Sequence, residues 1–440
     1  MKNFKRNIAL LSALALAGTM LAGCGASTDA GNTNAGNAGA ADAGAADAGN
    51  ADAGAADAGN AGAADTGAAD AAADTGKVLK ICAWNEEFKG LFETYYAGTA
   101  PISGTETYYD KAPGLPEGVT VEWVITANEG NAYQDKLDQD LLAQESASGD
   151  DLIDMFLFEA DYALKYVNSP YTLDVKSIGL SDGDLAEMYQ YTKDICTDDS
   201  GALKGVSWQA TPGLFAYRRS IAKDVIGSDD PADVQAAVAD WGKFSETAAA
   251  AKDKGYFMLS GYDDAYRTFS NNVAAPWVDA NNKIVVDSNL MTWVDQTKEF
   301  TDKGYNEGSS LWSDVWAQGQ SAAGKVFGYF YSTWGINFTL LGNAGDEGFG
   351  DWGVFEGPQS YYWGGSWLAG CAGTDNAGLV ADIMKHMTCN AETMTAITEN
   401  TQDYTNNASA MNALANSDFK SDFLGGQNHI ALFAEAAPKI

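Results

Sequence analysis

The feature that most limits how this chain folds is residues 25–76, a segment with almost nothing to bury. Of these 52 residues, 23 are Ala and 11 are Gly, and the segment contains eight Asp, no Lys or Arg, and no aromatic side chain. A segment without apolar side chains cannot offset the entropy lost on folding, and its like charges keep it extended. We therefore expect an extended tether here and a folded region that starts at Lys77. A short Ala-rich helix is the alternative, which the regularly spaced Gly and Asn disfavour.

The residues before this segment have the form of an export signal. Three basic residues stand within the first six positions, and an apolar run from Ile8 to Leu21 follows them. The run is too short for a comfortable transmembrane span and ends in small residues. It leads into Leu21-Ala22-Gly23-Cys24, which resembles the lipobox of bacterial lipoproteins. The resemblance implies removal of residues 1–23, a lipid on Cys24, and a tether over residues 24–76 that holds the protein at the outer face of the cell membrane. A buried hydrophobic helix with an incidental cysteine is the alternative.

The charge balance excludes several classes of partner. The chain has 26 Lys plus Arg against 60 Asp plus Glu, a formal net charge of −34. Nucleic acids and anionic membrane surfaces require a basic face, so we expect neither to bind the folded region. Aromatic residues are abundant, with 12 Trp, 20 Tyr and 18 Phe, and aromatic faces bind apolar and sugar-ring surfaces. Because His386 and His429 are the only histidines, we expect no metal site and no cofactor.

The cysteines beyond Cys24 do not form a metal-binding motif. Cys82, Cys196, Cys371 and Cys389 lack the CxxC spacing of zinc sites. Cys82 and Cys371 stand in apolar, strand-like runs, so we expect them to be buried thiols. A disulfide is possible outside the cell, but the sequence does not say which cysteines would pair.

From Lys77 the chain alternates between strand-like and helix-like patterns. Short apolar runs at 78–84, 119–125 and 153–158 are typical of buried strands. Apolar residues recur at every fourth position from Tyr133 to Leu141, which places them on one face of a helix. Strands that alternate with helices pair in parallel through right-handed crossovers. The sequence therefore predicts an α/β fold.

A second set of patterns follows the interruption at Thr211-Pro212-Gly213. Asp230-Pro231 has the form of a cap, and an amphipathic helix is expected from there through Phe244. Another helix, from Leu290 onwards, is expected to end at Gly304. Strands are expected at 214–217, 256–260 and 326–331.

An acidic and amide-rich turn lies inside the second set. Asp279-Ala280-Asn281-Asn282-Lys283 is flanked by Val278 and by Ile284-Val285-Val286. A calcium loop is the less favoured interpretation, because the spacing of the acidic residues is incomplete. We expect a hairpin turn.

Two α/β sets, an export signal and a tether together resemble the extracellular solute-binding proteins of ABC importers, in the maltose-binding-like sugar group. The resemblance extends over residues 77–440 and rests on the order of the expected strands and helices and on short local residue patterns. Four segments carry it: Ile81–Glu86, Phe158–Tyr162, Gly324–Gly335 and Trp363–Gly370.

The resemblance implies a fold of two lobes, each a mostly parallel sheet flanked by helices, joined by a hinge. Residues 77–211 and 366–412 would form the first lobe, including a late helix at 379–387, and residues 212–365 and 413–440 the second. The chain would cross between them near 210–214 and 364–369. Relatives usually continue with further helices, so a truncated C-terminus is expected. It also implies a monomer that delivers its ligand to the permease subunits of a transporter.

Ligands of open parallel sheets bind beyond the carboxyl ends of the strands. A sugar needs aromatic faces there for its C–H patches and planar polar groups for its hydroxyls. Trp334 matches the position where the family places a stacking Trp. Tyr266 and Asp264 match a stacking aromatic and an acidic hydroxyl acceptor. The other candidates are chosen by their place beside strand ends and crossings: Asp161, Asn85, Glu86, Trp208, Gln209, Trp363 and Trp367.

Each candidate also has a structural interpretation. Helix capping accounts equally well for Asp161, Asn85 and Glu86. The Trp residues could instead be buried in the core or between the lobes. Tyr361 and Tyr362 are weaker candidates. The pair Arg218-Arg219 could face an anionic ligand, but a strand-flanking basic pair is more often solvated.

The sequence thus predicts a binding protein for a mono- or oligosaccharide rather than an enzyme. HExxH and Walker motifs are absent from the sequence. Two of the 60 carboxylates could still lie at the separation that a glycoside hydrolase needs. A peptide, polyamine or metal receptor of the same fold is a further alternative, because the acidic surface would suit a polyamine.

Overall fold

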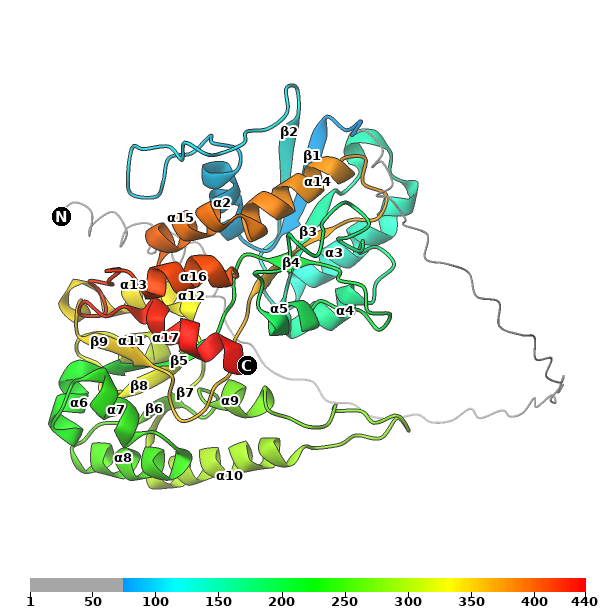
Figure 1. Cartoon of the computed structure of the whole chain (residues 1–440). Coiled ribbons are helices and arrows are strands. Elements are labelled where there is room, and N and C mark those ends of the chain that lie inside the picture. Colours follow the sequence, from blue (N-terminus) through cyan, green and yellow to red (C-terminus); the bar gives the residue numbers. More distant parts are fainter. Residues whose placement is uncertain (1–73) are drawn as a thin grey trace, which may run out of the picture. The chain divides into compact units, whose positions relative to one another are not determined.

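The computed structural model describes residues 74–440, which form two lobes, each around its own sheet (Figure 1). The expected signal peptide at 1–23, the lipidated Cys24 and nearly all of the expected tether at 24–76 lie outside the described residues. Among the helices of the described part, none is both long and apolar enough to cross a membrane.

The first lobe contains a five-stranded sheet in the order β2-β1-β3-β10-β4. β1 pairs in parallel with β2 and β3, as the strand–helix alternation predicts, whereas β10 is antiparallel to both of its neighbours. β10 reverses direction because it enters this sheet from the second lobe. The strands are β1 (Val78–Ala83), β2 (Thr120–Ile125), β3 (Met155–Glu159), β4 (Val206–Ser207) and β10 (Ser366–Gly370).

The second lobe departs from the expected mostly parallel pairing. Its sheet β8-β5-β9 is wholly antiparallel, and β6 and β7 form a separate parallel pair. The reason is the route of the chain: β5 leaves the hinge at Gly213, where it pairs with Ser332 at the end of β8, so β8 runs back towards the hinge. The strands are β5 (Gly213–Arg218), β6 (Leu259–Gly261), β7 (Asn306–Ser309), β8 (Gly328–Ser332) and β9 (Trp352–Phe355).

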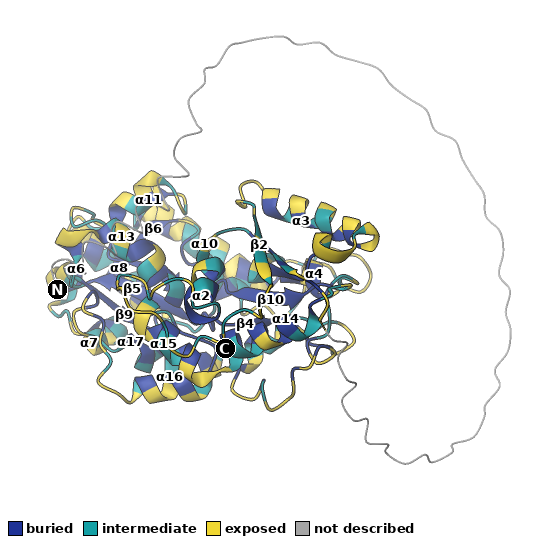
Figure 2. Cartoon of the chain, turned by 90° about the horizontal axis from the view of Figure 1, so that it is seen from above, coloured by how far each residue is buried: buried dark blue, intermediate teal, exposed yellow. Residues whose placement is uncertain are grey.

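Helices cover both sheets, and Figure 2 shows buried strands beneath helices whose outer faces are exposed. In α3, Tyr133, Leu137 and Leu141 are the buried residues, as their spacing predicts. In the first lobe the helices are α2 (Glu87–Tyr95), α3 (Ala132–Ala143), α4 (Ala163–Val167), α5 (Gln190–Asp194), α14 (Ala377–Met384) and α15 (Ala391–Thr401). Those that follow β5 are α6 (Arg219–Ile226), α7 (Pro231–Ala237), α8 (Trp241–Asp253), α9 (Tyr266–Ser270), α10 (Ser288–Lys303), α11 (Asp314–Gly319), α12 (Thr333–Gly335) and α13 (Leu341–Ala344), and the chain ends with α16 (Ala408–Ala415) and α17 (His429–Ala436).

One expected helix proves to be two. Asp230 caps α7 through the Ala232 N–H, but the helix ends at Val238, and Asp240 caps α8 through the Lys243 N–H. The apolar pattern continues across the break because both helices bury side chains in the same lobe. The expectation for α10 is confirmed, since it ends at Gly304 with φ +66°.

The hairpin turn is confirmed. Val278 and Ile284 form an antiparallel bridge, and Asp279 accepts hydrogen bonds from the N–H groups of Asn281 and Lys283. The carboxylate of Asp279 is thus used by its own turn. This explains why a sequence with calcium-loop texture forms a hairpin.

The prediction of buried thiols is confirmed for Cys82 and Cys371. Cys196 is buried too and Cys389 is half-buried, and all four are free thiols. Burial raises the pKa of Cys82 to about 12, which keeps this thiol protonated and unreactive at neutral pH.

The expectation that Arg218 and Arg219 are solvated is wrong. Arg218 is buried and pairs with Asp351 at 3.0 Å, while its guanidinium also donates to the carbonyl of Ser321. Arg219 donates to the carbonyl of Trp352. Both side chains therefore fasten the second lobe together, because a buried guanidinium needs several acceptors.

Two of the places where the chain crosses between the lobes, near Thr211 and Trp363, pair with each other. Pro212 forms an antiparallel bridge with Tyr362, and the N–H of Trp363 donates to the carbonyl of Thr211. Thr211 in turn donates its hydroxyl to the carbonyl of Gly364. Any residue placed by these crossings lies where the two lobes meet.

Candidate functional site

Three tryptophans gather beside the crossings and form what we call the aromatic wall: Trp312, Trp334 and Trp363. Trp334 follows β8 directly, as the sequence predicts, and its Nε1 donates to the carbonyl of Trp363 at 2.9 Å. The Trp334 and Trp363 rings meet edge to face at 5.3 Å, and Trp334 itself is only half-buried. The wall therefore keeps apolar ring surface accessible at the meeting of the lobes.

Trp312 was not predicted from the sequence. Its ring stacks on Trp334 with centroids 6.1 Å apart, and 52% of the residue is exposed. Its φ is +66°, a conformation that is costly for a bulky side chain and that collects at functional sites. The strand-end argument that selected Trp334 after β8 would also have selected Trp312, because Trp312 lies shortly after the end of β7.

An ion pair links the two lobes next to this wall. Asp161, which follows β3 of the first lobe, binds Arg267 on α9 of the second lobe through both carboxylate oxygens, with Nη2 2.6 Å from Oδ2. The Arg267 guanidinium lies 5.7 Å from the centre of the Trp363 ring. Asp161 was predicted to accept hydroxyl protons from a ligand, and here its partner is Arg267, which the sequence did not single out.

Glu159 lies beneath this ion pair. Its Oε2 accepts the N–H of Asp161 at 2.8 Å, and a Cβ added at Gly364 would stand 3.4 Å from its Oε1 and 3.1 Å from Nε1 of Trp334. Burial raises the pKa of Glu159 to about 7, against the opposing charge of Arg267. Gly364 has φ +75° and no side chain, so the carboxylate can lie close to the aromatic wall.

A second pair of carboxylates lies at the hinge. The amide of Gln209 donates to Glu87 Oε1 at 2.9 Å and to Asp403 Oδ2 at 3.1 Å, and the Thr333 hydroxyl donates to Asp403 Oδ1 at 2.6 Å. Burial and the charge of Asp403 raise the pKa of Glu87 to about 8, and burial raises that of Asp403. Gln209, a predicted candidate, thus bridges the pair, and Thr333 places it next to Trp334.

The predicted residues beside Glu87 have other roles. Asn85 stands two residues before α2, and its Oδ1 accepts the N–H of Glu87, the first residue of the helix, at 3.0 Å. Glu86 is exposed and lies 3.5 Å from Lys89. The sequence therefore indicated the right helix start but not the carboxylate that faces the hinge.

Trp208 and Trp367 lie inside the core of the first lobe, so their burial does not support the predicted contact with a ligand. Trp208 is 1% exposed and stacks on Phe88 at 5.1 Å. Trp367 is also 1% exposed, stacks on Phe158 and donates its Nε1 to the carbonyl of Thr192. Trp208 directly follows β4 and Trp367 stands in β10, and a strand-end argument cannot distinguish such buried positions from the rim of the sheet.

Asp264 lies in the turn before α9, and Tyr266 is the first residue of α9, next to Arg267. Asp264 is 6% exposed, and one oxygen accepts the N–H groups of Ser260 and Gly261 at 2.8 and 3.0 Å. Burial raises its pKa to about 7. Tyr266 is half-buried against Trp293 with ring centres 5.0 Å apart. Asp264 therefore shapes the loop from within, and Tyr266 remains accessible.

The weaker candidates Tyr361 and Tyr362 lie on the second crossing. Tyr361 is buried and donates its hydroxyl to the carbonyl of Leu214. Tyr362 is half-buried and stacks on Tyr191 at 5.8 Å. Within the described residues, no group of three or more His, Cys, Asp or Glu could hold a metal ion.

The sequence of this chain matches a known protein family. The model of the bacterial extracellular solute-binding protein family matches residues 108–423, most of the chain. This chain is a bacterial extracellular solute-binding protein. The resemblance inferred from the sequence is thereby confirmed, and the family is one of binding proteins rather than enzymes.

Solved structures share the two-lobed fold of this solute-binding protein. An extracellular solute-binding protein of family 1 aligns with a TM-score of 0.66 and 17% identity over 82% of this chain and 88% of the other. The binding protein from B. animalis subsp. lactis, in complex with beta-1,6-galactobiose, aligns with a TM-score of 0.59 and 18% identity over 82% of this chain and 86% of the other. The galacto-N-biose-/lacto-N-biose I-binding protein from Bifidobacterium longum, in complex with lacto-N-biose, aligns with a TM-score of 0.57 and 13% identity over 83% of this chain and 86% of the other. No curated protein sequence matches the chain.

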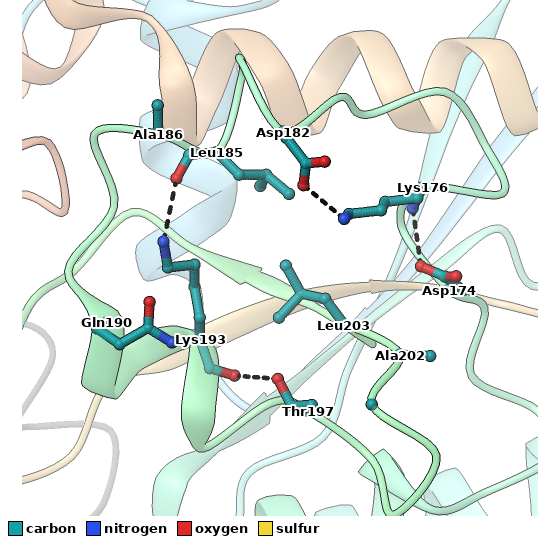
Figure 3. Close-up of a pocket in the computed structure, with 11 residues that line it drawn as sticks. Asp174, Lys176, Asp182, Leu185, Ala186, Gln190, Lys193, Thr197, Ala202 and Leu203 are labelled. Atoms are coloured by element: carbon teal, nitrogen blue, oxygen red, sulfur yellow. Dashed lines mark hydrogen bonds and ion pairs between the residues drawn. The ribbon is translucent and has the colours of Figure 1, made fainter. Parts of the chain in front are cut away.

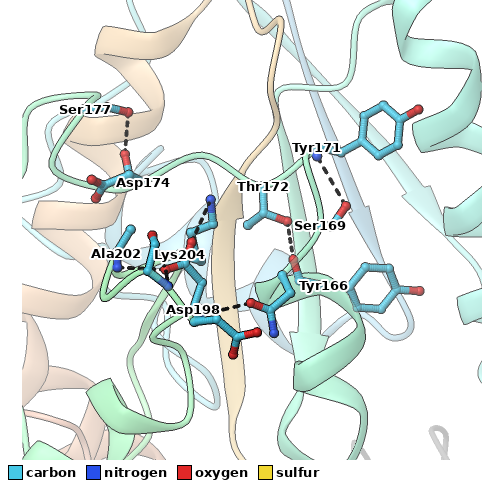
Figure 4. Close-up of polar contacts among 12 residues, drawn as sticks. Tyr166, Ser169, Tyr171, Thr172, Asp174, Ser177, Asp198, Ala202 and Lys204 are labelled. Carbon is cyan, nitrogen blue, oxygen red and sulfur yellow. Dashed lines mark hydrogen bonds and ion pairs between the residues drawn. The ribbon is translucent and has the colours of Figure 1, made fainter. Parts of the chain in front are cut away.

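The solute-binding protein also has a separate hollow on its first lobe. This cavity of about 410 Å³ is bordered by the 174–203 region (Figure 3). Its charged groups bind within the lobe: Lys176 pairs with Asp182 at 2.5 Å, and Lys193 donates to the carbonyl of Leu185. The turn at Asp198, which accepts the N–H groups of Ser200 and Ala202, fixes one wall (Figure 4). The hollow lies apart from the aromatic wall, and we assign it no ligand.

Proposed function

We propose that this protein is the substrate-binding lipoprotein of an ABC transporter, which captures a mono- or oligosaccharide between its lobes and delivers it to the permease. The observation that carries the proposal is the aromatic wall at the meeting of the lobes. Trp334 and Trp312 offer stacking surface for the C–H face of a sugar ring.

The polar groups beside the wall suit hydroxyl recognition. Gln209, Glu87 and Asp403 present planar amide and carboxylate groups next to Trp334. Such groups accept and donate paired hydrogen bonds. The galactobiose and lacto-N-biose named for two structural neighbours agree with a carbohydrate ligand.

The capture step is a hinge closure about the two crossings. Gly364 and Gly365 have φ of +75° and +110°, which other residues rarely adopt. Gly213 begins β5 where a Cβ would lie 2.4 Å from the Tyr361 ring. We propose lobe bounds of 77–211 with 366–412 and 212–365 with 413–440, so that these two crossings and a third near residue 412 fall at the boundary.

The location follows from the family and from the N-terminal sequence. The family is extracellular. The proposed lipid on Cys24 would keep the protein on the outer face of the cell membrane, within reach of the permease. We propose that it acts there as a monomer.

The test is a thermal-shift screen of mono- and oligosaccharides, followed by calorimetry. A ligand that binds only the folded state raises the melting temperature. One or more sugars should bind saturably with one site per chain and without turnover. Release of product from an oligosaccharide would favour the alternative of a surface glycoside hydrolase.

A polyamine is the second candidate ligand, and the charge balance favours it. Glu87, Glu159, Asp161 and Asp403 lie around the hinge, and the positive charge of Arg267 lowers the pKa of Glu159 against the effect of burial. An ammonium group would be attracted by these carboxylates and by the aromatic wall. Spermidine in the same screen, binding where no sugar does, would replace the carbohydrate proposal.

A further inference from the structure

The ion pair between Asp161 and Arg267 is held in place from both sides. On the first lobe, the Asp161 N–H is bound by Glu159 and the Ala160 N–H donates to the Gly365 carbonyl at 3.2 Å. On the second lobe, the guanidinium lies against the Trp363 ring. Two parallel hydrogen bonds between an arginine and a carboxylate require a defined orientation of both partners. The pair therefore requires an arrangement of the two lobes that brings Asp161 and Arg267 within hydrogen-bond distance.

We propose that Asp161 and Arg267 form a latch that holds the lobes together in the ligand-free protein. The inference rests on the proposed hinge closure, and it adds a contact that favours the closed arrangement of the lobes. The two side chains contact each other directly, so the contact needs no ligand in order to form. A ligand that binds the closed arrangement then binds more tightly. The reason is that apparent affinity scales with the fraction of molecules that already adopt the closed, binding-competent state.

The expected strength of the latch follows from its exposure. The side chains are 26% and 47% exposed, so the attraction is partly screened by water. Exposed ion pairs change an equilibrium by at most about fivefold, and the two-point geometry places this pair near that upper value. Salt should weaken the latch, since the Debye length falls to about 3 Å at about 1 M.

The experiment is small-angle scattering of the ligand-free protein. Asp161→Asn removes the charge but keeps the shape, and the radius of gyration should shift to a larger value than in the wild type. The exchanged variant, Asp161→Arg with Arg267→Asp, restores attraction and should return the radius towards the wild-type value. The matched control is Asp138→Asn, which removes an ion pair with Lys165 inside the first lobe and should leave the radius unchanged.

The same radius for Asp161→Asn and the wild type at low salt would overturn the latch. Failure of the exchanged variant, with its fold intact by circular dichroism, would do so as well. Neither result touches the proposed function, which is tested by saturable binding of a sugar. Absence of sugar binding with an intact salt-dependent latch would instead overturn the proposed function alone.

Discussion

The ring of Trp312 stacks on the ring of Trp334, with their planes 23° apart and their centroids separated by 6.1 Å. Trp312 precedes α11 and Trp334 forms part of α12, so two separate segments of the second lobe build one surface. Neighbouring side chains that share a contact respond non-additively to mutation. The aromatic wall should therefore act as a unit.

The first prediction concerns Trp334. Truncation of an aromatic side chain that covers a sugar face costs roughly 1–3 kcal/mol, so Trp334→Ala should weaken binding of the best sugar from the screen by about tenfold to a hundredfold. Calorimetry measures the affinity per folded molecule. The matched control is Trp241→Ala, a half-buried Trp stacked on Phe269 in the same lobe, which should lower the melting temperature and leave affinity unchanged. Unchanged affinity in Trp334→Ala would remove this residue from the site.

The second prediction separates strain from stacking at Trp312. Both Trp312→Ala and Trp312→Gly remove the exposed ring, and both should weaken binding to a similar degree. Alanine retains the cost of a positive φ and glycine does not, so the glycine variant should be more stable by roughly 1 kcal/mol. Chemical unfolding of the two ligand-free variants checks this difference. Equal stabilities would show that the backbone relaxes when the ring is absent.

The third prediction concerns attachment to the membrane. Lipid transfer requires the thiol of Cys24, so Cys24→Ala should release the protein from the membrane fraction or leave its signal uncleaved. Fractionation with an antibody, and mass spectrometry of the N-terminus, measure these outcomes. A variant that stays membrane-bound with the wild-type N-terminus would contradict the lipoprotein proposal.

Sequence periodicity predicted those parts of the fold that local burial determines. The Tyr133–Leu141 spacing gave the buried face of α3, and Gly304 gave the end of α10. The break between α7 and α8 was missed because both helices bury apolar residues on one side, which preserves the pattern across Asp240.

The candidate site was predicted only in part, because its partners come from distant segments. Trp334 and Gln209 were found from their places beside a strand end and a crossing. Arg267 was missed because its role depends on its ion pair with Asp161, a residue 106 positions away in the other lobe. Trp208 was a candidate too and is buried in the core, since a strand end alone does not show which face of the sheet the ring enters.

The last prediction concerns pH and Asp264. This carboxyl is 6% exposed and has one oxygen without a partner among the described residues, and burial raises its pKa in the folded protein to about 7, from the usual 3.8. The folded state thus binds the proton more tightly than the unfolded state. The stability contribution of Asp264 is therefore complete below about pH 4, and it is lost as the pH rises towards 7.

Asp264→Asn should remove this dependence, because the amide oxygen can still accept the N–H groups of Ser260 and Gly261 without carrying a charge. At one pKa unit per 1.36 kcal/mol, the variant should gain at most roughly 4 kcal/mol relative to the wild type between about pH 4 and pH 8. Urea unfolding of ligand-free protein at several pH values measures the gain, with the exposed Asp418→Asn as the matched control. Glu87 and Glu159 titrate in the same direction, with pKa values raised to about 8 and about 7, but they are present in both proteins and cancel in the difference. A difference between variant and wild type that is constant over this range would show that Asp264 stays charged in the folded protein.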